Sequence, residues 1–99
     1  MNMKTTDEIL TLLEEFKPYA QQRYGITRIG VFGSVARGEQ REDSDVDICY
    51  EGRVLSLLTI DMLQRELEKL LGSKVDAVRI RDNMNPLLHR RINTEGLYV

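Results

Sequence analysis

Two aspartates stand one residue apart in the stretch Ser44-Asp45-Val46-Asp47, near the middle of the 99-residue chain. Because side chains of a β-strand alternate between its faces, Asp45 and Asp47 would point the same way, about 7 Å apart along the strand. Two carboxylates held side by side repel each other, and a bound cation removes that cost. Oxygen ligands of this kind suit Mg²⁺, which commonly shares its shell with substrate phosphates. Taken alone, the pair is better explained as incidental charges on an exposed edge strand.

A Gly-Ser pair, Gly33-Ser34, ends the apolar run that precedes these aspartates. A glycine after a strand lets the backbone approach a ligand closely, and a following helical turn offers free N–H groups to an anion. The Ser34 hydroxyl adds a further donor. In isolation the pair is an ordinary strand-to-helix turn, but beside two aspartates it becomes a candidate phosphate site.

A third carboxylate, Asp76, interrupts the apolar stretch KVDAVRI. A lone buried carboxylate is costly, so Asp76 needs a partner or a role. It could lie on the surface or pair with Arg79 or Arg81. If its strand is the neighbour of the Asp45 strand, three carboxylates converge, which is an arrangement that can hold two metal ions.

The elements that must position these residues follow from capping signals and apolar periodicity. A capping box at Thr5 and Glu8 starts a helix that we expect to end at Gly25, with Pro18 kinking or dividing it. Ser56 caps a helix that Gly72 ends, and Asn85-Pro86 starts a short helix to Ile92. The predicted strands cover residues 26–32, 45–50, 74–80 and 97–99. A short helical turn at residues 34–37 is predicted between the first two strands. This order predicts an α/β (α+β) domain with helices packed on one small sheet.

The composition is that of an ordinary globular domain, with 41% hydrophobic and 30% charged residues. We expect one domain over residues 1–99, since this length leaves no room for a second core. The net charge of -2 argues against nucleic-acid binding, and no apolar run approaches the ~18 residues of a membrane span. The first residues lack the layout of a secretory signal, so a cytoplasmic location is expected. The single Cys49 cannot form an internal disulfide.

The combined pattern resembles the signature of the minimal nucleotidyltransferases of the DNA polymerase β superfamily. That signature is Gly-Ser-x-x-Arg-Gly, here residues 33–38, then a short polar loop, then Ser-Asp-x-Asp, here 44–47, and a later single Asp on a strand, here Asp76. The combination is far more specific than its parts. It implies the nucleotidyltransferase fold, with a small mixed sheet of about four strands.

The resemblance also implies a role for each matching residue. Gly33 and Ser34 would hold the β- and γ-phosphates of a nucleoside triphosphate. Asp45 and Asp47 would bind two Mg²⁺ ions, and Asp76 would bind the catalytic ion and help to deprotonate or orient the acceptor hydroxyl. The reaction would be in-line attack on the α-phosphorus with release of pyrophosphate, driven by positioning and charge neutralisation.

Arg37 and Ser44 complete the candidate nucleotide-binding set. Arg37 could touch the triphosphate or cap the short helix, and we favour the structural role. Ser44 is expected to fix the loop rather than to touch the nucleotide. Of the other reactive residues, we expect His89 on the surface, Cys49 in the core, and Tyr98 in the core or at an interface.

Standalone minimal members of this group resemble the antitoxins of two-gene modules whose toxin is a HEPN-domain ribonuclease. The resemblance therefore implies a Mg²⁺-dependent enzyme that transfers AMP from ATP to a tyrosine of a HEPN toxin partner. One alternative is a non-catalytic antitoxin that acts by covering its toxin, although three intact carboxylates argue against it. Another is a small-molecule nucleotidyltransferase, akin to the aminoglycoside-modifying enzymes, that needs a partner subunit.

Overall fold

The computed structural model describes residues 4–99, and within them the elements follow the order predicted from the sequence. The predicted domain also includes residues 1–3, which lie outside this described range. The bounds of the elements are α1 Thr6–Tyr24, β1 Ile26–Phe32, α2 Gly33–Ala36, β2 Val46–Gly52, α3 Leu57–Leu71, β3 Val75–Arg79, α4 Pro86–Glu95 and β4 Leu97–Tyr98.

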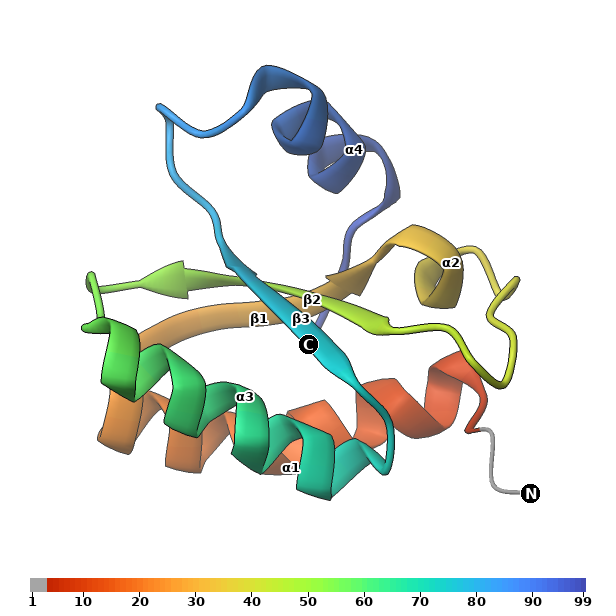
Figure 1. Cartoon of the computed structure of the whole chain (residues 1–99), viewed down its shortest axis with the longest axis horizontal. Helices are drawn as coiled ribbons and strands as arrows, with labels where there is room; N and C mark the ends of the chain where they lie inside the picture. Colours follow the sequence, from red (N-terminus) through yellow and green to blue (C-terminus); the bar gives the residue numbers. More distant parts are fainter. Residues whose placement is uncertain (1–3) are drawn as a thin grey trace.

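The strands form one mixed sheet in the order β3-β2-β1-β4. β1 pairs antiparallel with both β2 and β4, whereas β2 and β3 are parallel. Parallel neighbours need a crossover connection, and α3 supplies it. In Figure 1, α1 and α3 lie together on one face of the sheet, and α4 lies on the other face.

Each face of the sheet has its own apolar core. The larger core joins the sheet to α1 and α3, with Leu13, Ile48 and Leu67 fully buried. The smaller core lies under α4 and contains Phe32, Cys49, Met84 and Ile92. Along β2, Val46, Ile48 and Tyr50 enter the larger core. Because strand side chains alternate, the residues between them face α4. This alternation decides which face carries the predicted aspartates.

Helix α1 begins and ends as predicted but differs from the prediction in its middle. The Thr5 hydroxyl accepts the Glu8 N–H at 3.1 Å, and Glu8 Oε1 accepts the Thr5 N–H at 2.8 Å. Gly25, at φ +68°, closes the helix. The helix is continuous through Pro18, so the predicted division there is wrong. Within residues 4–99, no helix, α1 included, is long and apolar enough to cross a membrane.

Two boundaries differ from the prediction in ways that bear on the site. β2 starts at Val46, so Asp45 lies just before the strand rather than in it. α4 starts as predicted, with Asn85 Oδ1 accepting the N–H groups of Leu87 and Leu88 at 2.9 and 3.2 Å. It continues three residues beyond the predicted end at Ile92 and includes Glu95. That last turn of α4 reaches the Gly33 turn, as described below.

Candidate active site

The two parallel strands β2 and β3 bring Asp47 and Asp76 together. These residues are register partners across the pair, as are Val46 and Val75. Partners in a sheet project on the same face, so both carboxylates lie on the α4 face. Asp45 precedes Asp47 by two residues and is exposed, as is Asp76. The strand that follows Asp45 and the strand that carries Asp76 are therefore neighbours in the sheet, as predicted.

The charges of these carboxylates act on one another. Partial burial raises the pKa of the Asp47 carboxyl, and the nearby negative charge of Asp76 and then that of Asp45 raise it further. Arg91 and Arg37 oppose this rise in the pKa of Asp47. Like charges that disfavour each other's ionised form would gain from a cation between them.

The ion pairs proposed as the alternative for Asp76 are not formed in the described part of the chain. Arg79 Nε donates to the Gly52 carbonyl at 3.2 Å, and Arg81 Nη1 donates to the Arg79 carbonyl at 3.2 Å. Asp76 is exposed, which avoids the cost of burying an unpaired carboxylate. Its oxygens are accessible to a ligand.

The donor set of the site fits a hard divalent cation, since it consists of carboxylate oxygens. Within residues 4–99, however, no three His, Cys, Asp or Glu side chains are assembled so that they could hold one ion. Asp47 and Asp76 form a pair with Asp45 beside it rather than a closed cage. A cation here would therefore draw its remaining ligands from substrate and water, as Mg²⁺ commonly does.

Gly33 turns the chain from β1 into α2 directly against this pair. Its φ is +73°, a conformation that side chains disfavour. A Cβ at Gly33 would overlap Oδ2 of Asp47. Only glycine fits here, and its absence of a side chain places the turn against the Asp47 carboxylate. The structure thus brings the two predicted halves of the site, Gly33-Ser34 and the aspartates, into contact.

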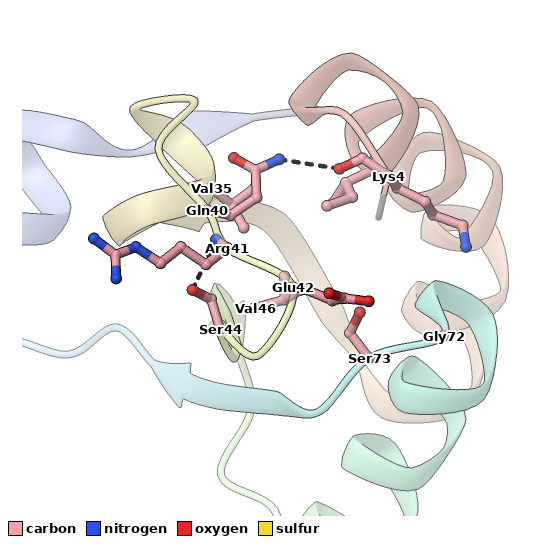
Figure 2. A pocket seen from close by; sticks show the side chains of 10 residues that line it. Lys4, Val35, Gln40, Arg41, Glu42, Ser44, Val46, Gly72 and Ser73 are labelled. Carbon is pink, nitrogen blue, oxygen red and sulfur yellow. Dashed lines mark hydrogen bonds between the residues drawn. The ribbon is translucent and has the colours of Figure 1, made fainter. Parts of the chain in front are cut away.

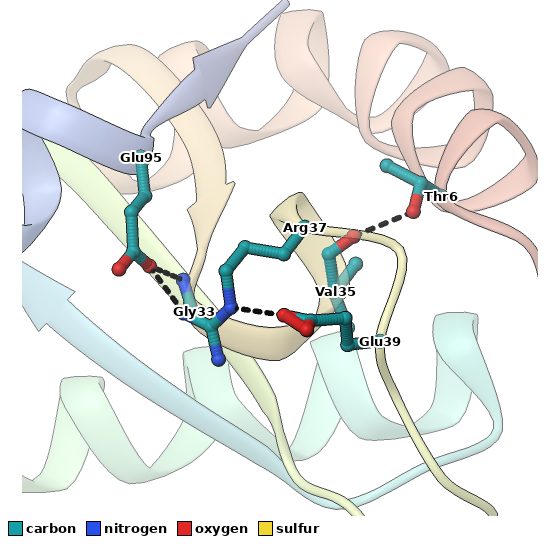
Figure 3. A network of polar contacts seen from close by, with 6 residues as sticks. All are labelled: Thr6, Gly33, Val35, Arg37, Glu39 and Glu95. Atoms are coloured by element: carbon teal, nitrogen blue, oxygen red, sulfur yellow. Dashed lines mark hydrogen bonds and ion pairs between the residues drawn. The ribbon is translucent and has the colours of Figure 1, made fainter.

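A network of hydrogen bonds and ion pairs holds this turn in place (Figure 3). The Gly33 N–H donates to Glu95 Oε2 at 3.0 Å, and Arg37 Nη1 donates to the same oxygen at 2.8 Å. Arg37 Nε also donates to Glu39 at 2.6 Å. The guanidinium therefore lies between two carboxylates, which supports the structural role that we favoured for Arg37.

The two predicted serines differ in what holds them. Ser34 is partly exposed in the turn, and its carbonyl accepts the Glu39 N–H at 2.8 Å. Ser44 Oγ accepts the Arg41 N–H at 2.9 Å, while the Ser44 N–H donates to the Arg41 carbonyl at 3.0 Å. This reciprocal pair closes the loop before β2, in agreement with a loop-fixing role for Ser44.

The other reactive residues lie where we expected them or near it. Cys49 is buried under α4, and burial raises the pKa of its thiol to about 11. Tyr98 is half-buried beside it, and burial together with Cys49 raises the pKa of its hydroxyl to about 12. His89 is only partly exposed, on α4. None of the three contributes to the pair of carboxylates.

Sequence reasoning missed Arg91 and Glu95, one helical turn apart on α4. No role for Arg91 is predicted from the sequence, and Glu95 falls beyond the predicted end of the helix at Ile92. The available signal was their spacing: residues i and i+4 share a helix face, and Ile92 on that side is buried against the sheet. Extending the helix by one turn would have placed both over the site.

A separate pocket of about 210 Å³ lies away from these carboxylates. The residues around it include Lys4, three residues of the loop before β2 and the end of α3, namely Arg41, Glu42, Ser44, Gly72 and Ser73 (Figure 2). Val46 also lines it, and Val46 points to the opposite side of β2 from Asp47. The candidate site is consequently an open face of the sheet and not this hollow.

Comparison with known proteins bears on this geometry. Residues 13–99 match the model of the nucleotidyltransferase domain family. The chain belongs to this family. The protein adenylyltransferase MntA of Thermococcus cleftensis is 40% identical over 100 residues, which cover 100% of both chains. The predicted membership is confirmed.

Solved structures agree with the predicted fold. A minimal nucleotidyltransferase superposes with a TM-score of 0.78 at 34% identity, covering 98% of both chains. A chain of a toxin–antitoxin complex with AMP-PNP superposes with a TM-score of 0.71 at 27% identity, covering 96% of this chain and 72% of that one. The predicted nucleotidyltransferase fold, with helices on a four-stranded mixed sheet, is therefore confirmed.

Proposed function

We propose that this nucleotidyltransferase transfers AMP from ATP to a tyrosine hydroxyl of a HEPN-type toxin partner. The observation that carries the proposal is the in-register pair Asp47 and Asp76, on the sheet face that the Gly33 turn adjoins. The name of the Thermococcus cleftensis relative and the AMP-PNP in the similar toxin–antitoxin complex support this choice of nucleotide and partner.

In the proposed reaction, the Gly33-Ser34 turn holds the β- and γ-phosphates. The acceptor oxygen attacks the α-phosphorus, a new P–O bond forms, and the bond to the β-phosphate breaks to release pyrophosphate. Asp76 orients the acceptor hydroxyl and takes its proton, and its exposure makes this possible. Two Mg²⁺ ions, held by Asp45, Asp47 and Asp76, would supply charge neutralisation of the phosphates.

The openness of the site supports a macromolecular acceptor. Asp45 and Asp76 are exposed, so no part of residues 4–99 covers them. A partner surface that docks on this face would deliver its hydroxyl and exclude water in the same step.

The test is to incubate the protein with ATP labelled at the α-phosphate, Mg²⁺ and the product of the adjacent open reading frame. We expect label on the partner and loss of the partner's ribonuclease activity. Asp47→Ala should abolish both effects. Neutralisation by that variant without labelling would support the binding-only alternative, and labelling of small hydroxylated compounds but not of the partner would support the small-molecule one.

A further inference from the structure

Arg91 reaches from α4 over the Gly33 turn. Its Nη2 lies 3.5 Å from the point where a Cβ on Gly33 would stand. Its Cζ lies 5.7 Å from the centre of the ring of Phe32, the residue directly before the turn. The same Cβ position on Gly33 lies against Oδ2 of Asp47. Arg91 therefore stands beside both the turn and the carboxylates.

The guanidinium of Arg91 is not committed to a carboxylate in the way that of Arg37 is. The ion pairs within 4.0 Å in residues 4–99 do not include Arg91. Arg37, by contrast, is shared between Glu39 and Glu95. Of the two arginines near Gly33, Arg91 is thus the one whose donors could turn to an incoming anion without breaking an ion pair.

A cation at this place would offset part of the negative charge of the site. The carboxylates of Asp45, Asp47 and Asp76 gather negative charge on the face to which the triphosphate must come. Two divalent ions would offset part of it, but pyrophosphate gains charge as it leaves. An arginine presents a planar fork of donors that matches phosphate oxygens and remains charged throughout the reaction.

We propose that Arg91 binds the β- and γ-phosphates of the nucleotide at the Gly33 turn and stays with them as pyrophosphate leaves. This inference rests on the proposed nucleotidyl transfer and adds to it a residue from α4. It also gives the last turns of α4 a role in the site, since Ile92, next to Arg91, anchors the helix in the smaller core.

The experiment measures the affinity of the full chain, with Mg²⁺, for AMP-PNP, for pyrophosphate and for AMP by calorimetry. Because a charge-assisted hydrogen bond is lost, Arg91→Ala should weaken AMP-PNP and pyrophosphate about tenfold to a hundredfold. Binding of AMP, which lacks the two outer phosphates, should stay within about twofold of the unsubstituted protein. Arg91→Lys keeps the charge but not the planar fork of donors. Its affinities for AMP-PNP and pyrophosphate should therefore lie between those of Arg91→Ala and those of the unsubstituted protein.

Arg90→Ala is the matched control, since Arg90 is the adjacent exposed arginine of the same helix. It should leave all three affinities unchanged. Equal weakening by both variants, equal weakening of AMP and AMP-PNP by Arg91→Ala, or unchanged binding by Arg91→Ala would each overturn the inference alone. If the unsubstituted protein binds no AMP-PNP, the proposed function fails and this inference with it. Arg91→Lys keeps the test valid should Arg91→Ala fold poorly, as thermal melting will reveal.

Discussion

At the scale of single residues, Asp47 is the point where stability and chemistry conflict. Its carboxylate is partly buried, faces Asp76 across the strand pair, and touches the space that a side chain on Gly33 would need. Burial and like charges disfavour its ionised form in the folded protein. A residue that costs stability as it stands is a candidate metal ligand, because a cation would remove that cost.

Asp47→Asn should therefore stabilise the fold at neutral pH and abolish transfer. The pKa of Asp47 is raised on folding, so the unfolded state loses its proton first and stability falls as the pH rises from the ordinary value towards the raised one. At pH values above the raised pKa of Asp47, the full destabilisation by its charged carboxylate remains. Thermal melting should show a gain for the variant at pH 7 that disappears in acid below the ordinary Asp pKa, while the transfer rate falls about a hundredfold or more. A loss of stability at pH 7 would contradict this reading.

Gly33→Ala should destabilise the fold more than Gly38→Ala does. Both glycines have left-handed backbones, with φ of +73° and +70°, so each alanine should cost about 1–2 kcal/mol for the backbone alone. At Gly38 nothing lies within 4 Å of the added Cβ, whereas at Gly33 it meets Asp47. Urea unfolding of the two variants measures the difference, which reports the contact between the turn and the carboxylate. Equal losses of unfolding free energy in the two variants would show that Asp47 moves away from the added Cβ at little cost.

At the scale of elements, α4 is the part that completes the site. It covers the smaller core through Ile92 and carries Arg91 and Glu95 to the Gly33 turn. The carboxylate of Glu95 satisfies the Gly33 N–H and holds Arg37 at the same oxygen. The orientation of the turn thus depends on a helix more than fifty residues further along the chain.

Glu95→Ala should lower the rate of transfer about tenfold or more, because small displacements of a binding turn are costly in catalysis. Glu95→Gln keeps an oxygen for the Gly33 N–H and should restore part of the loss. Glu39→Ala removes the other, more exposed partner of Arg37 and is the control. Steady-state kinetics with AMP transfer as readout separates the three variants. A rate for Glu95→Ala equal to that of Glu39→Ala would argue against a role in positioning.

Elements that are specified locally were predictable from the sequence, and those specified at a distance were not. Ser56 caps α3 by accepting the Thr59 N–H at 3.2 Å, and Gly72 ends it in a left-handed conformation. Both signals lie within a few residues of the feature they set. Asp45, Asp47, Gly33 and Ser34 carry a motif of fixed spacing, which likewise needs no tertiary knowledge.

The partners of Gly33 could not be predicted in this way. Glu95 lies 62 residues from Gly33, and the sequence contains no spacing that links them. The predicted division of α1 at Pro18 is wrong for a related reason: tertiary packing of α1 on the sheet outweighs the local cost of a proline within a helix. Long-range packing decides both cases, and the helix and turn preferences of neighbouring residues do not reveal it.

At the scale of the whole molecule, the sheet joins all the elements. We propose that the described residues fold as one unit, since β1 and β2 contribute to both the larger and the smaller core. The end of the chain is tied to this unit: the Val99 N–H donates to the Ile29 carbonyl at 3.1 Å, and Lys17 Nζ donates to the Val99 carbonyl at 2.8 Å.

Unfolding in urea should consequently be a single transition, with coincident curves from far-UV circular dichroism and from tyrosine fluorescence. Tyr24 and Tyr50 report the larger core, and Tyr98 packs against the smaller one. Two separated transitions would show that the α4 face unfolds independently of the rest.

Because a side chain at position 33 would overlap the Asp47 carboxylate, a mutation at one of these positions limits which residues the other position tolerates. A larger residue at 33 is accommodated most simply when residue 47 becomes smaller, and a smaller residue there no longer offers the carboxylate. Once both have changed, reverting either one alone recreates the collision or leaves the acidic group missing. Loss of this site is therefore easy to reach in single steps and hard to reverse.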